Sequence, residues 1–170
     1  MQLKNYQNNT LNVLRKFFEQ ARICGHKQAF ENIVSEPEIS YRLGKLKSPY
    51  IEWSTIPNTP RVCLKVPTGG GKTIIAAHAL KITSEVWMER EFPIVLWFTP
   101  SDTIRQQTAE ALKNPRHPYR EVLDEQFGGH VKVFDIDEKF FLNDMPQIII
   151  DDGDMPSIKR GKIVASKRGR

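Results

Sequence analysis

A glycine-rich segment between an apolar stretch and a helical pattern constrains this chain more than any other feature. The segment reads Val66-Pro67-Thr68-Gly69-Gly70-Gly71-Lys72-Thr73. Residues 61–66 before it predict a strand, and apolar residues at helical spacing from Thr73 to Trp87 predict a helix. Consecutive glycines let backbone N–H groups converge on phosphate oxygens, and a helix N-terminus favours negative charge at the same point. The order therefore predicts a phosphate-binding loop; the alternative is a glycine-rich turn before an ordinary amphipathic helix.

Two side chains of this segment suit a nucleotide bound with a metal ion. Lys72 can reach the β- and γ-phosphates of ATP, and the hydroxyl of Thr73 can coordinate Mg²⁺. ATP and Mg²⁺ are therefore the expected ligands. The residues of the segment predicted to hold them are Pro67, Thr68, Gly69, Gly70, Gly71, Lys72 and Thr73.

The segment Pro67–Thr73 resembles motif I of superfamily 2 helicases and translocases, closest to the ATPase subunits of type III restriction enzymes and related DEAD/DEAH-box proteins. Val66 stands where the usual phosphate loop has a glycine, and this departure points to that family. The resemblance implies an α/β fold with a partial RecA-like domain, in which a parallel sheet is flanked by helices and preceded by a helical extension. It also implies ATP hydrolysis that drives movement along double-stranded DNA in the complete enzyme, with a methyltransferase subunit as a candidate partner.

Residues 93–101 extend the resemblance. They form an apolar run that ends in a polar turn, and they precede a predicted helix whose N-cap is Ser101 or Asp102. The run resembles motif Ia of the family, which implies that Thr99, Pro100 and Ser101 contact the nucleic-acid backbone. The alternative is that the run is simply the second strand of a parallel sheet, and both interpretations can be true because ligands bind at the ends of such strands.

A third segment, Tyr6-Gln7, precedes a helix with an apolar face. Many superfamily 2 proteins have this pair, and the resemblance implies that Gln7 reads the adenine edge. An amide suits that task because it offers a donor and an acceptor side by side. A solvent-exposed glutamine beside a packing tyrosine is the alternative.

The only candidate for the acidic box of the family is the pair Asp151-Asp152, which follows three isoleucines. By the resemblance, Asp151 would bind Mg²⁺ and Asp152 would replace the glutamate that polarises the attacking water. Asp152 is one methylene shorter than that glutamate, and the following Gly153-Asp154 does not resemble the Ala-His of the family.

The chain is expected to contain a helical segment (1–60), an incomplete RecA-like ATP-binding domain (61–155) and a basic, disordered tail (156–170). Besides the strand at 61–66, strands are predicted at 93–98, 130–135 and 146–151. Helices are predicted at 7–23, closed near Gly25, at one or two places between 27 and 60, at 102–113 and at 119–127.

The net charge of the chain is +5, and the excess of basic residues that produces it lies in the tail. Six of the 25 basic residues lie after residue 155, where there is no acidic residue, and the other 19 are balanced by 20 acidic residues. Such a tail can bind nucleic acid without sequence specificity, so it is weak evidence for DNA recognition. Two cysteines and four scattered histidines predict neither disulfides nor a zinc site, and no run predicts a membrane span, so a cytoplasmic location is expected.

The sequence shows no second RecA-like domain and no arginine motif. We therefore expect Mg²⁺-ATP binding with weak or no hydrolysis by this chain. Two alternatives stay open at this stage. One is a truncated or frameshifted remnant without catalytic function, and the other is a small P-loop phosphotransferase.

Overall fold

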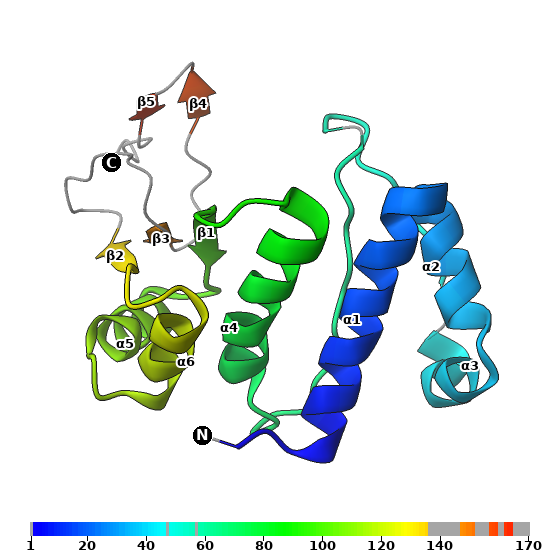
Figure 1. Ribbon diagram of the computed structural model, residues 1–170, viewed down its shortest axis with the longest axis horizontal. Helices are drawn as coiled ribbons and strands as arrows, with labels where there is room; N and C mark the ends of the chain where they lie inside the picture. The colour runs from blue at the N-terminus through cyan, green and yellow to red at the C-terminus, as the bar shows by residue number, and fades with distance from the viewer. Residues whose placement is uncertain are drawn as a thin grey trace. The chain divides into compact units, whose positions relative to one another are not determined.

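The computed structural model describes residues 2–46, 48–56 and 58–135, together with the backbone of strands at 147–151, 157–159 and 162–164. The chain divides into two compact units, residues 1–90 and 91–170, and each is described by itself (Figure 1). Within the described residues, no helix combines the length and the apolar character that crossing a membrane requires.

The first unit is helical. Its longest helix, α1 (Asn5–Cys24), ends at Gly25, whose φ of 80° favours glycine, as the sequence predicts. The other elements of the unit, seen in blue to green in Figure 1, are α2 (His26–Ser35), α3 (Pro37–Leu43), the 3₁₀ turn η1 (Gly44–Leu46), α4 (Lys72–Ile82) and the π-helical turn η2 (Thr83–Met88).

One apolar face of α1 forms the centre of the first core. The five residues predicted for that face are all buried, namely Leu11, Leu14, Phe17, Phe18 and Ala21. They pack against Ala29 and Ile33 of α2 and against Ile75 and Ile82 of α4. Because α1 contacts α4 along this core, its first turn is held beside the loop that precedes α4.

The predicted helix after the glycine segment is present, but it changes character towards its end. It forms α4 and then continues as the π turn η2. The hydroxyl of Thr83 donates to the carbonyl of Ala79 at 2.9 Å, and that of Ser84 donates to the carbonyl of Arg90. Hydroxyl groups that bond to backbone carbonyls can compete with the regular ladder, which fits a change of helix type at this point.

The predicted strand at 61–66 is wrong. These residues carry no strand pairing, and the side chains of Val62 and Leu64 are each 37% exposed. The segment is instead tied to the unit through Arg61, whose N–H donates to the hydroxyl of Tyr50 at 2.8 Å. A β-branched composition favours a strand only where a partner strand supplies the hydrogen bonds, and composition alone does not supply that partner.

The second unit contains a three-stranded sheet of order β1-β3-β2. The strands are β1 (Ile94–Phe98), β2 (Lys132–Asp135) and β3 (Gln147–Asp151), and β3 is parallel to both neighbours. In the register, Asp151 lies opposite Phe98, and Asp135 lies opposite Ile150. Strands predicted at 93–98, 130–135 and 146–151 are thus found at nearly the predicted bounds.

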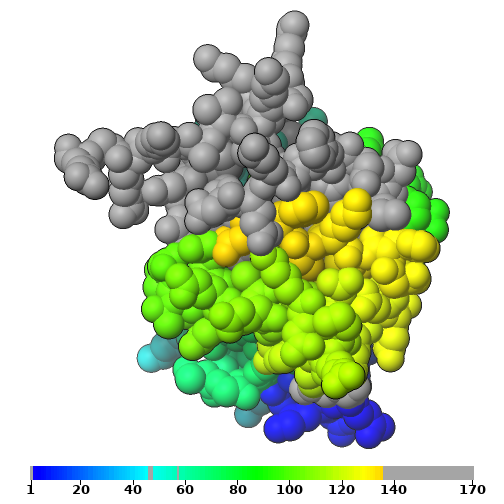
Figure 2. Space-filling model, turned by 90° about the vertical axis from the view of Figure 1, so that its left-hand side faces the viewer, coloured from blue at the N-terminus to red at the C-terminus, as the bar shows by residue number. Residues whose placement is uncertain are grey.

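Helices α5 (Asp102–Lys113) and α6 (Pro118–Gln126) lie side by side in this unit, and Figure 2 shows them in yellow-green and yellow on one face. Both are predicted by the sequence. Leu112 of α5 and Val122 and Leu123 of α6 are all buried. Arg120 reinforces the packing, because its guanidinium donates to the carbonyls of Leu112 at 3.2 Å and Val131 at 2.8 Å.

A short antiparallel pair, β4 (Ser157–Lys159) and β5 (Lys162–Val164), lies in the segment predicted as a disordered tail. The structure therefore differs from that prediction at these six residues. The β-branched residues Ile158, Ile163 and Val164 favour extended pairing, and the basic composition on which the prediction rested does not oppose a single pair.

Candidate nucleotide site

The glycine segment of the first unit forms a tight loop in which two glycines have no room for a side chain. A Cβ atom on Gly70 would lie 2.7 Å from the Val66 side chain and 2.9 Å from the carbonyl oxygen of Pro67. A Cβ atom on Gly71 would lie 2.5 Å from Nε2 of Gln7 and 2.9 Å from the Ile74 side chain. The Gly70 N–H donates to the carbonyl of Pro67 at 3.0 Å, which closes the turn.

Gly71 is the N-cap of α4, in a left-handed conformation with φ 76° and ψ 44°. Its carbonyl accepts the N–H of Ile75 at 3.0 Å, so the helix begins here. The first N–H groups of a helix have no acceptor within the helix, and they carry part of its positive dipole. No acidic residue lies in the first turn of α4 to compete for them. This end of α4 therefore suits an anion.

Lys72 and Thr73 occupy the first two positions of α4. Lys72 is exposed, and its ammonium group donates to the carbonyl of Pro67 at 3.2 Å, so its side chain folds back over the start of the loop. Thr73 is half-buried. Thr68 and Gly69 are exposed, and Gly69 has a φ of 74° with open space where a Cβ would be. The seven predicted loop residues thus form one continuous segment that leads into the first turn of α4.

The first turn of α1 is bonded to this loop. The hydroxyl of Tyr6 donates to the carbonyl of Gly70 at 2.7 Å, and Nε2 of Gln7 donates to the same carbonyl at 3.1 Å. Oε1 of Gln7 accepts the N–H of Lys4 at 2.8 Å. Gln7 is only 4% exposed. The alternative of a solvent-exposed glutamine is therefore wrong, and the adenine role of Gln7 stays a prediction.

The polar turn after β1 lies in the second unit. Thr99 is buried and its hydroxyl donates to the carbonyl of Ser101 at 3.3 Å, whereas Pro100 and Ser101 are exposed. Ser101 is the N-cap of α5, because its hydroxyl accepts the N–H of Ile104 at 3.4 Å. This confirms one of the two N-caps that the sequence allows. A role of the three residues in contacting nucleic acid stays a prediction.

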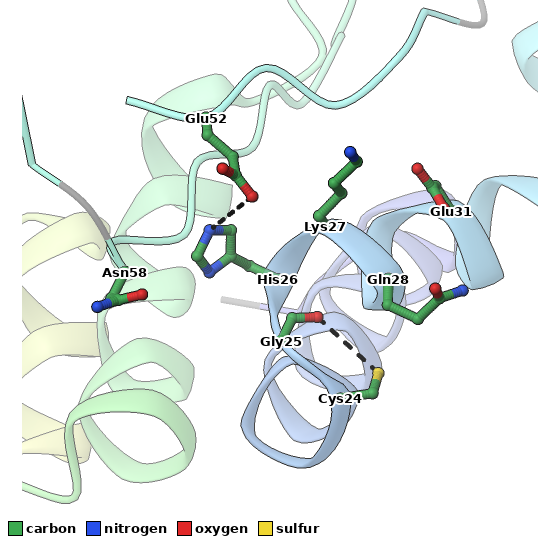
Figure 3. A pocket seen from close by; sticks show the side chains of 8 residues that line it. All are labelled: Cys24, Gly25, His26, Lys27, Gln28, Glu31, Glu52 and Asn58. Atoms are coloured by element: carbon green, nitrogen blue, oxygen red, sulfur yellow. Dashed lines mark hydrogen bonds and ion pairs between the residues drawn. The ribbon is translucent and has the colours of Figure 1, made fainter. Parts of the chain in front are cut away.

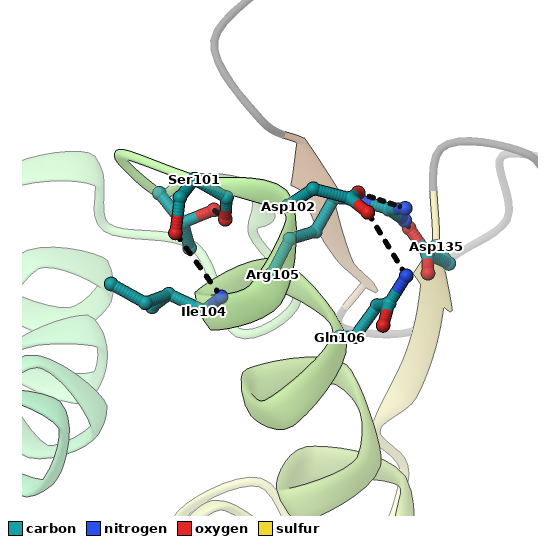
Figure 4. Close-up of polar contacts among 7 residues, drawn as sticks. Ser101, Asp102, Ile104, Arg105, Gln106 and Asp135 are labelled. Atoms are coloured by element: carbon teal, nitrogen blue, oxygen red, sulfur yellow. Dashed lines mark hydrogen bonds and ion pairs between the residues drawn. The ribbon is translucent and has the colours of Figure 1, made fainter.

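Arg105, for which the sequence predicts no role, is a buried charged residue of the second unit (Figure 4). It is 8% exposed and donates to Asp102 at 2.6 and 2.8 Å and also to Asp135 at the end of β2. The bond to Asp102 raises the pKa of the guanidinium; burial lowers it, and Asp135 raises it further. Arg105 thus stays charged and fastens α5 to the edge strand β2.

The predicted acidic pair is described only in part. Asp151 is the last residue of β3, and its side chain lies outside the described residues, as does the whole of Asp152. Of the two predicted Mg²⁺ ligands, only Thr73 has a described side chain. Within the described part of the chain, no three acidic, histidine or cysteine side chains gather as a metal site.

A separate hollow of about 510 Å³ lies at the junction of α1 and α2 (Figure 3). Its lining contains the ion pair between His26 and Glu52, with 3.7 Å between the nitrogen and the oxygen, together with Lys27 and Glu31. Opposite charges are therefore mixed within it. The phosphate loop contributes no residue to this hollow, so it is distinct from the candidate nucleotide site.

One protein-family model matches this chain. Residues 1–152 match the family model described as "Type III restriction enzyme, res subunit". No curated protein and no solved structure matches the chain significantly. The match includes the phosphate loop, the Tyr6-Gln7 pair and the turn after β1, which are the segments that carry the resemblance in the sequence.

Proposed function

We propose that this chain, which belongs to the family of type III restriction enzyme res subunits, is the ATP-binding portion of a DNA helicase or translocase. In the complete enzyme, ATP hydrolysis drives movement along double-stranded DNA, and a methyltransferase subunit is the candidate partner. The family is a helicase-like ATPase family of superfamily 2. ATP and Mg²⁺ are therefore the ligands that this proposal requires.

The phosphate loop is the observation that carries the proposal. Two glycines are packed so closely that neither has room for a Cβ, and the second of them opens α4. Glycine also lets backbone N–H groups approach a ligand closely, because no side chain intervenes. The ammonium group of Lys72 lies beside the carbonyl of Pro67 in the loop, and no acidic residue lies in the first turn of α4. The local charge therefore suits a polyphosphate.

The remaining assignments follow the family. Lys72 neutralises the developing charge on the β- and γ-phosphates, and Gln7 contributes to adenine recognition. By the family resemblance, Thr73 and Asp151 would hold Mg²⁺, and Asp152 would act on the attacking water. Mg²⁺, when bound, neutralises phosphate charge. The division into a helical segment (1–60) and an incomplete RecA-like domain (61–155) is part of the same proposal.

Calorimetry with Mg²⁺-ATP tests the nucleotide site. The wild-type chain is expected to bind, and Lys72→Ala is expected to weaken the affinity by about 10- to 100-fold, because a bond between charged groups contributes about 1.5–3 kcal/mol. Lys27→Ala is the matched control, since Lys27 is an exposed lysine on α2. Equal affinities for the wild type and Lys72→Ala would contradict the site.

The turn after β1 can be tested separately for contact with DNA. Ser101→Asp keeps an oxygen acceptor for the cap of α5 but adds a negative charge. We expect it to leave the melting temperature almost unchanged and to weaken binding of a double-stranded oligonucleotide about 3- to 10-fold, measured by fluorescence anisotropy, because phosphate contacts dominate such binding. Gln107→Glu adds the same charge at an exposed position further along α5 and should have a smaller effect. Equal effects of the two variants would refute contact at this turn.

A further inference from the structure

The carbonyl of Gly70 receives two side-chain hydrogen bonds from the first turn of α1. The donors are the hydroxyl of Tyr6 at 2.7 Å and Nε2 of Gln7 at 3.1 Å, and they lie 64 and 63 residues away in the sequence. Gly70 itself is buried. A backbone carbonyl in a phosphate-binding loop is thus fixed from outside the loop by another element.

The orientation of this carbonyl determines that of its neighbour. In a planar trans peptide unit, the C=O and the N–H point in opposite directions. The carbonyl of Gly70 and the N–H of Gly71 belong to one such unit. Because Tyr6 and Gln7 hold the carbonyl towards α1, the N–H of Gly71 is directed away from α1, at the point where α4 begins.

We propose that Tyr6 is a positioning residue for phosphate binding: its hydroxyl fixes the peptide unit between Gly70 and Gly71, so that the Gly71 N–H is directed at the phosphate. A carbonyl turned into the loop would place a partial negative charge against the phosphate oxygens. The inference that the hydroxyl directs phosphate binding rests on the proposed nucleotide site. The fixing of the peptide unit itself does not.

Tyr6 can be tested without disturbing the core, unlike Gln7. The side chain of Gln7 is buried, makes bonds at both ends, and would lie 2.5 Å from a Cβ on Gly71. Tyr6 is 39% exposed, so Tyr6→Phe removes the hydroxyl and keeps the ring. Tyr41→Phe makes the same change on α3, where Tyr41 is 88% exposed, and is the matched control.

The first measurement is amide exchange by NMR on the nucleotide-free chain. The N–H of Gly70 donates to Pro67 and lies in the peptide unit next to the one that Tyr6 holds, so its exchange reports whether release of that unit loosens the turn. Tyr6→Phe is expected to speed the exchange of this N–H about 3- to 10-fold, because the loss of one hydrogen bond lowers the free energy of local opening by a corresponding amount. Exchange within the middle of α1 and the melting temperature are expected to stay close to those of Tyr41→Phe. Unchanged exchange at Gly70 would overturn the inference, whether or not the chain binds ATP.

The second measurement is calorimetry with Mg²⁺-ATP, Mg²⁺-GTP and inorganic pyrophosphate. Tyr6→Phe should weaken all three by a similar factor of about 3 to 10, because the hydroxyl acts on phosphate and not on the base. A loss confined to ATP would overturn the positioning role. Failure of the wild-type chain to bind any of the three would refute the proposed nucleotide function and the phosphate part of the inference, and the exchange result would still decide whether Tyr6 holds the loop.

Discussion

Gly71→Ala is expected to weaken Mg²⁺-ATP binding about 30-fold or more. The new Cβ would lie 2.5 Å from Nε2 of Gln7, so Gln7 would have to give up its bond to the carbonyl of Gly70. Losing a buried hydrogen bond costs about 1–3 kcal/mol, and a left-handed conformation costs a residue other than glycine about 1–2 kcal/mol. Together these amount to about 2–5 kcal/mol, which calorimetry would register as a large loss of affinity.

Gly69→Ala is the matched control for this variant. Gly69 also has a positive φ, 74°, but a Cβ there would meet no atom within 4 Å. The two variants therefore share the conformational cost and differ in the contact with Gln7. We expect Gly69→Ala to lose about tenfold in affinity and Gly71→Ala to lose several-fold more than that. Equal losses would show that the packing of Gln7 under the loop does not matter for binding.

The features predicted correctly from the sequence are local ones. The buried face of α1 follows from apolar residues at helical spacing, and its end follows from Gly25. The cap of α5 by Ser101 follows from a hydroxyl residue placed before a helical pattern. Each of these depends on residues within a few positions of one another, so the sequence pattern contains the necessary information.

The features that were missed depend on distant partners. The segment 61–66 has the composition of a strand, but whether it pairs depends on another strand. The bonds from Tyr6 and Gln7 to Gly70 join residues more than 60 positions apart, and no local pattern predicts them. These contacts arise because the packing of α1 against α4 brings its first turn to the loop.

Arg105 was missed for a related reason, although a signal existed. It lies three, four and seven positions before Thr108, Ala109 and Leu112, which are the other buried residues of α5, so it belongs to the buried face of the helix. An arginine on such a face requires a carboxylate partner. One partner, Asp102, is a helical neighbour, but the other, Asp135, is 30 residues away on β2.

Replacing Arg105 by methionine is expected to destabilise the second unit by about 2–4 kcal/mol. The change removes the bonds that fasten α5 to Asp135, whose side chain is only 20% exposed. Breaking a buried ion pair from one side costs about 3–5 kcal/mol because a charge stays in a poorly solvated place, and the partial exposure of Asp135 reduces that value. Chemical denaturation followed by circular dichroism measures the loss, with amide exchange in α5 to locate it.

Two further variants test the cause of that loss. In the double variant Arg105→Met with Asp135→Asn, the carboxylate charge that has lost its bond to Arg105 is removed as well. We therefore expect part of the stability to return, because much of the cost of breaking a buried pair comes from the charge that stays behind. Arg42→Ala breaks the exposed pair with Glu38 on α3 and is expected to change stability by no more than about 0.5 kcal/mol. If Arg105→Met costs as little as Arg42→Ala, or if Asp135→Asn restores nothing, the pair with Asp135 does not fasten α5 to the sheet, and apolar packing alone holds the helix.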